Sequence, residues 1–310
     1  MSVINFDELE NSRIKYRNRS LISVVVAVGI VLTSIFIKNH LQLEIDLMAI
    51  FIIDLVVISI VSAIILSGSK KKYVDNFKDY FVRRTLEKIF TDLHYEPDKG
   101  ISESVISGTG MMNTGDRYTA NDLIYGKYKN ISFMQSDICI EEEHQSTDSD
   151  GHTTTYYVTI FQGRWMIFDF NKTFKANVEV CEKGFSGNQA NTLFGKANKY
   201  QKVKMESEEF NKKFRVYAQD PHDAFYIITP SLMEKINRLE AANKGKLFLG
   251  FCNNQLHVGI HDGSDSFEPG SCFSKINEEE VMNRMSTDVS KITMFVDELE
   301  LDNDLFRKGV

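Results

Sequence analysis

A cysteine and two histidines could share one face of a short hairpin in the C-terminal third of the chain. The segment Leu247 to His261 alternates apolar with small or polar residues on both sides of Asn253-Asn254, a pair that tolerates the positive φ of a two-residue turn. With that turn, Cys252, His257 and His261 point to the same side of the sheet. A thiol beside an imidazole is what a cysteine nucleophile or a metal site needs.

No carboxylate or Asn is fixed beside these residues to orient an imidazole. The competing interpretation is that they lie on the less buried face of an ordinary hairpin, and we prefer it. Cys252 and His257 stay the candidates for an alternative function, a membrane-tethered hydrolase or thiol enzyme. Because no residue is fixed to orient an imidazole, we favour a binding protein over an enzyme.

Two loops have partial ligand-binding motifs. In Glu141 to His152, the fragment Asp148-x-Asp150-Gly151 resembles a calcium loop, but Tyr157 occupies the position of the bidentate Glu. The glycine-rich Gly108 to Gly115 matches neither a dinucleotide fingerprint nor a phosphate loop. We therefore predict no metal and no cofactor.

The chain as a whole is organised around two apolar runs, Leu21–Ile37 and Leu47–Leu66. Each is close to the roughly 20 residues that a helix needs to cross a bilayer, and a short linker makes them an antiparallel hairpin. Insertion is favoured by roughly 5 kcal/mol for the first run and roughly 6 for the second, against about 3 for Asp54. The first run is longer than the apolar core of a typical cleaved signal peptide, and no A-x-A-like site follows it.

Asp54 is the membrane-embedded polar residue of the second run. A carboxylate at that depth could serve as an ion or proton site. The interpretation that we favour is a hydrogen bond between helices, to Thr33, to Ser34 or to another copy of the chain.

The charges that flank the runs predict their orientation. Basic residues precede the first run and follow the second, whereas the linker Lys38 to Asp46 has one Lys. The positive-inside rule then places both termini in the cytoplasm of a multi-pass membrane protein. The residues that we expect to face anionic lipid headgroups are Arg13, Lys15, Arg17, Arg19, Lys70, Lys71 and Lys72.

Composition supports a membrane-tethered globular protein. The net charge of −7 gives no reason to expect nucleic acid as a partner. The four cysteines are widely spaced and read as free thiols. The predicted divisions are a cytoplasmic lead (1–20), a transmembrane hairpin (21–67, with spans 21–37 and 47–66), a juxtamembrane helix (68–99) and a cytoplasmic domain (100–310).

Periodicity in the cytoplasmic part predicts an α+β fold with a largely antiparallel meander sheet and a C-terminal amphipathic helix. A helix is expected over Tyr73 to Leu93, and another begins at Thr229 as N-cap with Pro230 at its first position. The expected strands are Leu123 to Tyr128, Ile131 to Glu143, Thr154 to Phe161, Arg164 to Phe170, Phe174 to Cys181, Lys202 to Met205, Phe214 to Ala218 and Ala224 to Ile228.

Three stretches together resemble a known family. They are FQGRWMIFDFNKTF (Phe161 to Phe174), KMESEEFNKKFRVYAQDPHDAFYIITPSLMEKI (Lys204 to Ile236) and the hairpin Leu247 to Ile260. The chain from Asp116 to Leu301 is similar to the bacterial membrane-protein family called domain of unknown function 3137. The resemblance implies a bacterial origin, and therefore the bacterial inner membrane as the location, with paired N-terminal spans and a cytoplasmic domain. It brings no activity, ligand or catalytic residue.

The function that we predict is binding without catalysis. An integral inner-membrane protein with a cytoplasmic α+β domain would bind a partner protein, a ligand or the lipid surface, with the bilayer itself as one partner. Another membrane or cytoplasmic protein, or a second copy that pairs through the spans, stays open.

Overall fold

A computed structural model describes residues 4–42, 46–169, 177–185 and 200–301. The chain divides into two compact units. The first consists of Met1–Arg84 with Glu268–Met285, and the second of Thr85–Phe267 with Ser286–Val310. Each unit is described by itself below.

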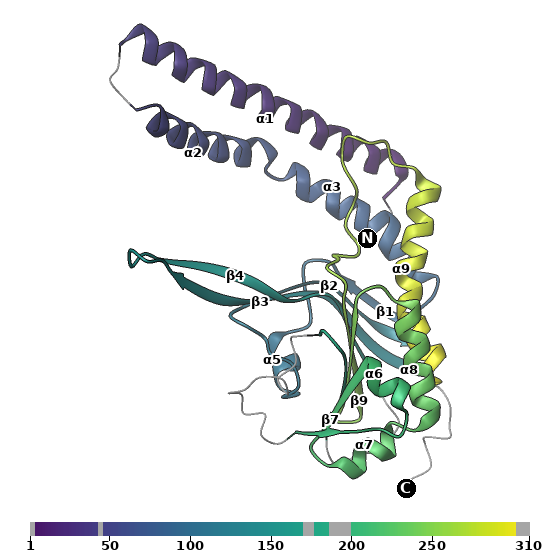
Figure 1. The fold of residues 1–310 in the computed structure, drawn as a ribbon. Helices are drawn as coiled ribbons and strands as arrows, with labels where there is room; N and C mark the ends of the chain where they lie inside the picture. Colours follow the sequence, from purple (N-terminus) through teal and green to yellow (C-terminus); the bar gives the residue numbers. More distant parts are fainter. Residues whose placement is uncertain (1–3, 43–45, 170–176, 186–199, 302–310) are drawn as a thin grey trace. The chain divides into compact units, whose positions relative to one another are not determined.

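The first unit contains two long antiparallel helices, α1 (Phe6–His40) and α2 (Leu47–Leu66) (Figure 1). A capping box between Asn5 and Glu8 begins α1. The segment expected as a cytoplasmic lead is helical from Phe6 onward, because the capping box starts the helix well before the apolar run.

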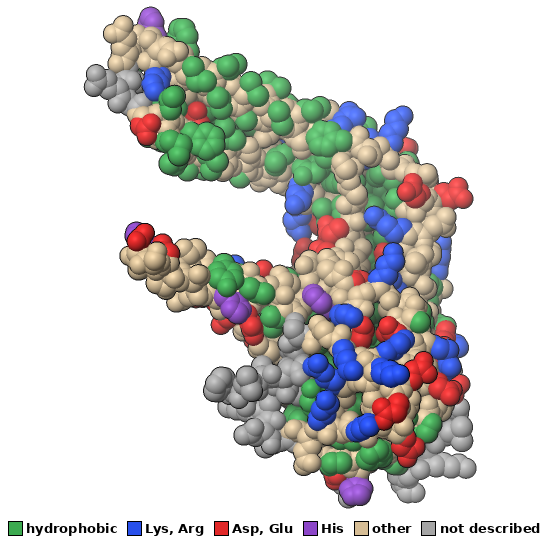
Figure 2. All heavy atoms as spheres, viewed as in Figure 1, with side chains coloured by type: hydrophobic (Ala, Val, Ile, Leu, Met, Phe, Trp, Pro, Cys, Tyr) green, Lys and Arg blue, Asp and Glu red, His purple; other side chains and the backbone are tan. Residues whose placement is uncertain are grey.

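Both helices are long and apolar enough to cross a membrane, and only 6% of the most apolar window of each is buried. Leu21 is 50% exposed and Val25 is 70% exposed. Figure 2 shows hydrophobic side chains along the outside of this pair. A core helix of a soluble protein would bury such side chains, so these two helices have the surface of membrane helices.

After α2 the chain continues as α3 (Ser69–Phe77), a π-helical turn (Lys78–Arg83) and α4 (Arg84–Glu87). The helix predicted over Tyr73 to Leu93 is thus too long. Residues Thr91–Glu96 form strand β1, which pairs with β2 at the sheet edge. Cross-strand pairing outweighs the helical spacing of these apolar residues.

The second unit is built on one antiparallel sheet of nine strands, in the order β1-β2-β3-β4-β9-β8-β5-β7-β6. Together with the two N-terminal helices and the C-terminal helix, it confirms the predicted α+β class. The remaining strands are β2 (Arg117–Tyr128), β3 (Ile131–Thr147), β4 (Thr153–Asp169), β5 (Val178–Glu182), β6 (Gln201–Val203), β7 (Phe214–Ala218), β8 (Lys246–Cys252) and β9 (Gln255–His261).

The meander holds for the first four strands, after which the β8–β9 hairpin inserts between β4 and β5. The two strands predicted over Thr154 to Phe170 are the single strand β4, which passes through Gly163 at a φ of 146°. The outer ends of β3 and β4 extend beyond the sheet as a two-stranded arm (Figure 1). Of the strand predicted from Phe174, residues 174–176 lie outside the described residues.

The helices of this unit are α5 (Glu103–Ser107), α6 (Glu208–Lys213), α7 (Pro221–Ile227), α8 (Pro230–Ala242) and the part of α9 (Glu278–Leu299) that follows Met285. Thr229 caps α8 as predicted. The strand expected over Ala224 to Ile228 is wrong. Asp220 caps a helix there and Pro221 occupies its first turn, a local signal that outweighs the apolar run.

Both faces of the central strands are covered. On one face, Phe168 of β4 packs against Phe295 of α9, and α8 lies beside α9 (Figure 1). On the other, Trp165 and its neighbours form a core with residues from α5 and the loop that follows it, including Ile106 and Met111. The sheet around Trp165 and Phe168 is consequently covered on both sides.

Candidate functional site

The structure places Cys252 and His257 on the same face of the β8–β9 hairpin, with the predicted turn at Asn253-Asn254. Both side chains are buried, since Cys252 is 1% exposed and His257 is 2% exposed, whereas Gln255 and His261 on the same face are only partly buried. Both belong to the interior beside Trp165, whose indole Nε1 donates a hydrogen bond of 3.3 Å to His257 Nδ1. Within the described ranges, no hydrogen bond joins the thiol to the imidazole.

Burial sets the charge of both groups. It raises the pKa of the Cys252 thiol to about 12 and lowers the pKa of His257 to about 4. At neutral pH the pair is therefore a thiol beside a neutral imidazole that already accepts a hydrogen bond. A nucleophile needs the thiolate and a free base, so this geometry does not support the thiol-enzyme alternative.

In the first unit, Asp54 of α2 lies against α1. Ser34 Oγ donates a hydrogen bond of 2.6 Å to Asp54 Oδ1. Nearer the polar end of the pair, Ser23 Oγ bonds to Ser62 Oγ at 2.8 Å. Two polar contacts thus fix the register of the antiparallel helices, and each removes a polar group from the apolar surroundings.

The basic residues near the ends of the apolar runs differ in what they contact. Arg13 is buried, bonded to both carboxylate oxygens of Glu10 and to the carbonyl oxygen of Cys272. Its guanidinium therefore lies inside the first unit, and contact with lipid headgroups stays a prediction for the other basic residues. Arg19 donates to the carbonyl oxygen of Ser67 at 3.0 Å, which places its guanidinium between α1 and the end of α2.

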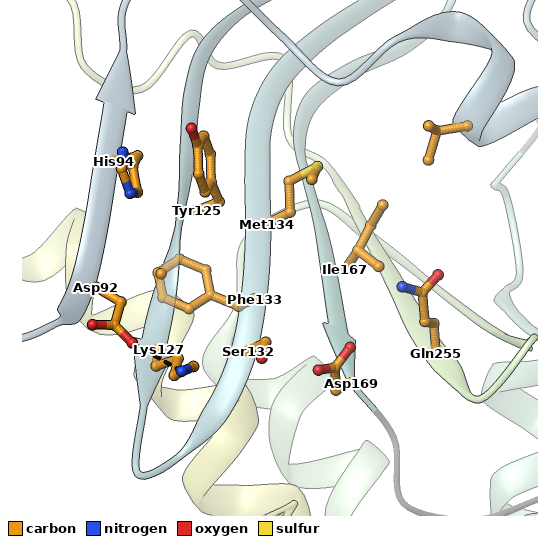
Figure 3. A pocket seen from close by; sticks show the side chains of 12 residues that line it. Asp92, His94, Tyr125, Lys127, Ser132, Phe133, Met134, Ile167, Asp169 and Gln255 are labelled. Atoms are coloured by element: carbon orange, nitrogen blue, oxygen red, sulfur yellow. Dashed lines mark hydrogen bonds and ion pairs between the residues drawn. The ribbon is translucent and has the colours of Figure 1, made fainter.

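A cavity of about 570 Å³ lies on the open part of the sheet in the second unit (Figure 3). Strands β1, β2, β3, β4 and β9 form it, with Val105 of α5 at one side. Its lining residues are Asp92, His94, Val105, Tyr125, Gly126, Lys127, Ser132, Phe133, Met134, Ile167, Asp169 and Gln255.

The cavity combines an apolar floor with a polar rim. Met134 and Ile167 are neighbours across β3 and β4 and supply apolar surface. At the rim, Lys127 Nζ pairs with Asp92 at 2.8 Å. The imidazole of His94 stacks on the ring of Tyr125 at 4.7 Å.

Sequence reasoning missed this cavity. Its residues come from five strands and one helix, and only the register of β1 against β2 brings His94 to Tyr125. The positions themselves carry no motif. Alternation along β3 is the one local signal, since Ser132 and Met134 are on the same side of that strand.

Three carboxylates also come together in the second unit, with oxygens of Asp122, Asp137 and Asp265 within 4.8 Å of one another. Burial raises the pKa of Asp137 to about 6, and Arg164 on the adjacent strand opposes that shift. Ser266 donates to Asp137 from its backbone nitrogen at 2.9 Å and from its hydroxyl. Because hydrogen-bond donors and a neighbouring cation hold the buried Asp137, we interpret the cluster as a structural network.

The fold and these sites define an α+β protein with two candidate membrane helices and a sheet that carries a ligand-sized cavity. Residues 159–301 match the family described as Protein of unknown function (DUF3137), which confirms the resemblance found in the sequence. The matched stretch begins in β4 and includes the β8–β9 hairpin and α9.

Among solved structures, the chain is similar to the crystal structure of the mycobacterial trehalose monomycolate transport factor A, TtfA. The identity is 12%, the TM-score is 0.37, and the alignment covers 67% of this chain and 88% of that one. A likeness at this level carries no functional argument. No curated protein matches the chain.

Proposed function

We propose that this chain is a membrane-anchored binding protein whose sheet cavity takes a small amphipathic ligand without catalysis. The observation that carries the proposal is that one chain contains both two exposed apolar helices and, in its other unit, a pre-formed cavity of about 570 Å³. Cavities of roughly 300–1,000 Å³ with an apolar floor and few polar groups are typical of small-molecule sites.

Anchoring is supported by the length and surface of the helices. Leu47–Leu66 contains 20 residues, which as a helix extend about 30 Å, the thickness of the hydrocarbon layer. The hydrogen bonds from Ser34 to Asp54 and between Ser23 and Ser62 provide partners for polar groups that lipid could not satisfy. The flanking positive charges then favour both termini in the cytoplasm, and a bacterial inner membrane as the location.

The rim of the cavity indicates the charge of the ligand. Asp92 and Lys127 neutralise each other. Among the lining residues that the structure describes, this leaves the Asp169 carboxylate without a balancing cation. A ligand with an aromatic or aliphatic body and a cationic or neutral head would therefore fit better than an anionic one.

Tryptamine, which has an aromatic body and an ammonium group, is a suitable probe. We expect saturation-transfer NMR signals from tryptamine with the full chain in lipid nanodiscs. Val105→Arg should abolish them by filling the cavity and adding a positive charge. The matched control is Val158→Arg, because Val158 is 40% exposed on the outer part of β4, whereas Val105 is 42% exposed at the cavity.

Equal signals from both variants, or no signal from the unmodified chain, would overturn the cavity assignment. Membrane anchoring is tested separately. The protein should stay in the membrane pellet after alkaline carbonate extraction, and release into the supernatant would contradict anchoring.

A further inference from the structure

A second hollow, of about 230 Å³, lies within the first unit at the base of the helix pair. It is formed between the N-terminal part of α1 and the link from α2 to α3. Its lining consists of three cations, Lys15, Arg19 and Lys72, and of small residues that include Ser12, Gly68 and Ser69.

The charge of this hollow is one-sided. Among the described residues that line it, none carries a carboxylate. Glu8 lines the adjoining hollow together with Lys15 and Lys72, and its carboxylate is bonded to Asn5 in the capping box of α1. Three cations around so small a space repel one another, and an anion placed between them would relieve that repulsion.

The donor set suits a phosphate group in particular. Arg19 presents a planar guanidinium that one hydrogen bond to the Ser67 carbonyl holds in place, which leaves other N–H groups to bind an oxyanion. Two lysines add mobile ammonium groups, the usual partners of phosphate oxygens. Small residues at Gly68 and Ser69 leave room for a tetrahedral group beside the backbone.

The depth of the hollow matches the headgroup layer. Arg19 precedes the first apolar residue, Leu21, by two positions, which is about 3 Å along a helix. Lys15 lies six positions before Leu21, which is about 9 Å along α1, and Lys72 lies six positions after Leu66, the last residue of α2. The polar region of a bilayer extends about 5–8 Å beyond the hydrocarbon on each side, so the three cations bracket it.

We propose that this hollow binds the phosphate group of an anionic phospholipid, with Lys15, Arg19 and Lys72 as its ligands. The inference rests on the proposed insertion of α1 and α2 into the bilayer. It goes beyond general attraction of basic residues to a charged surface, because it assigns one lipid to one cavity.

Two triple variants distinguish a specific phosphate-binding site from general attraction of basic residues to an anionic surface. Each removes three positive charges from the same two segments of the first unit, inside the hollow in one case and outside it in the other. The hollow variant is Lys15→Gln, Arg19→Gln, Lys72→Gln, and the matched control is Arg17→Gln, Lys70→Gln, Lys71→Gln.

The full chain would be placed in nanodiscs of phosphatidylcholine and phosphatidylglycerol, released, and examined by native mass spectrometry. We expect one retained phosphatidylglycerol on the unmodified chain and on the control, and at least about tenfold less on the hollow variant. Equal retention by the two variants, or equal loss, would overturn the proposal.

A second arm distinguishes a lipid from soluble phosphate. The ³¹P line of inorganic phosphate would be recorded with the protein in maltoside detergent. If the line broadens with the unmodified chain but not with the hollow variant, and no lipid is selectively retained, the hollow binds free phosphate and the lipid proposal is overturned. Carbonate extraction of all three proteins is the remaining control. If lipid retention fails while they stay in the pellet, the headgroup site is refuted and membrane anchoring stands.

Discussion

The packing around Gly259 predicts a stability change that the single tryptophan can report. A Cβ at position 259 would meet Trp165 Cζ3 at 2.9 Å and Cε3 at 3.0 Å, and Phe161 Cε2 at 3.1 Å. The indole cannot yield easily, since it is fully buried, bonded to His257 and packed on Phe248 at 5.2 Å. Gly259→Ala therefore forces overpacking in a rigid aromatic cluster.

Such overpacking costs about 1–3 kcal/mol, from which about 0.4–1 kcal/mol is regained because alanine restricts the unfolded chain. The net loss of about 1–2 kcal/mol corresponds to a fall in Tm of about 2–8 °C for a unit of this size. Trp165 is the one tryptophan in the sequence, so its fluorescence follows unfolding of the sheet directly.

Gly250→Ala is the matched comparison on the neighbouring strand. Its Cβ would approach Met111 Cε at 2.6 Å, the far end of a flexible side chain that can move aside. We expect a smaller fall in Tm than for Gly259→Ala. Equal losses, or an unchanged Tm for Gly259→Ala, would refute the reasoning that the indole is immobile.

Three further predictions concern reactivity, pH and the helix pair. Iodoacetamide should modify half-buried Cys139 before Cys252 in the native protein. At neutral pH the pKa of about 12 leaves Cys252 with about 3,000-fold less thiolate than an ordinary thiol has. Rapid labelling of Cys252 in the native protein would contradict this. Between pH 6.5 and 4, the Tm of the His257→Gln variant should fall by less than the Tm of the unmodified chain. An equal fall in both proteins would show that His257 does not titrate as described. Ser34→Ala should weaken association of the two helices by about 0.6–1.7 kcal/mol, measured by disulfide trapping between cysteines placed on them. An unchanged trapping yield would contradict a stabilising role for this hydrogen bond.

The sign of the His257 effect follows from linkage. Its pKa in the folded protein is about 4, below its ordinary value near 6.5 in an unfolded chain. Between those values the unfolded state binds the proton first, so stability falls as pH decreases, by up to about 3 kcal/mol. Asp137 acts in the opposite sense, because its raised pKa of about 6 lets the folded state bind a proton first. The change of stability with pH that is due to one of these groups is therefore measured with a variant that lacks that group alone.

Local signals predicted much of the fold. The two-residue turn at Asn253-Asn254 set the hairpin register, and Thr229 with Pro230 set the start of α8. Each depends on backbone preferences of adjacent residues, which a single sequence contains. Asp220-Pro221 is the same kind of signal and starts α7, although the apolar run that follows it is also typical of a strand.

Long-range neighbours could not be predicted in this way. His257 is buried because β4 flanks its strand and Trp165 lies against it, 92 positions earlier in the chain. The same limit applies to the sheet cavity and to the contact between Arg13 and Cys272, whose partners are distant in sequence. Alternation identifies a face, but it does not say what covers that face.

The most direct test is to locate the linker and the large domain on opposite sides of the membrane. A chain with His40→Cys would be expressed in bacteria and treated, in intact cells, with a membrane-impermeant maleimide. We predict labelling at position 40 and labelling of Cys139 only after the cells are opened. Labelling of Cys139 in intact cells, or of position 40 only after opening, would contradict a two-helix anchor with both termini in the cytoplasm.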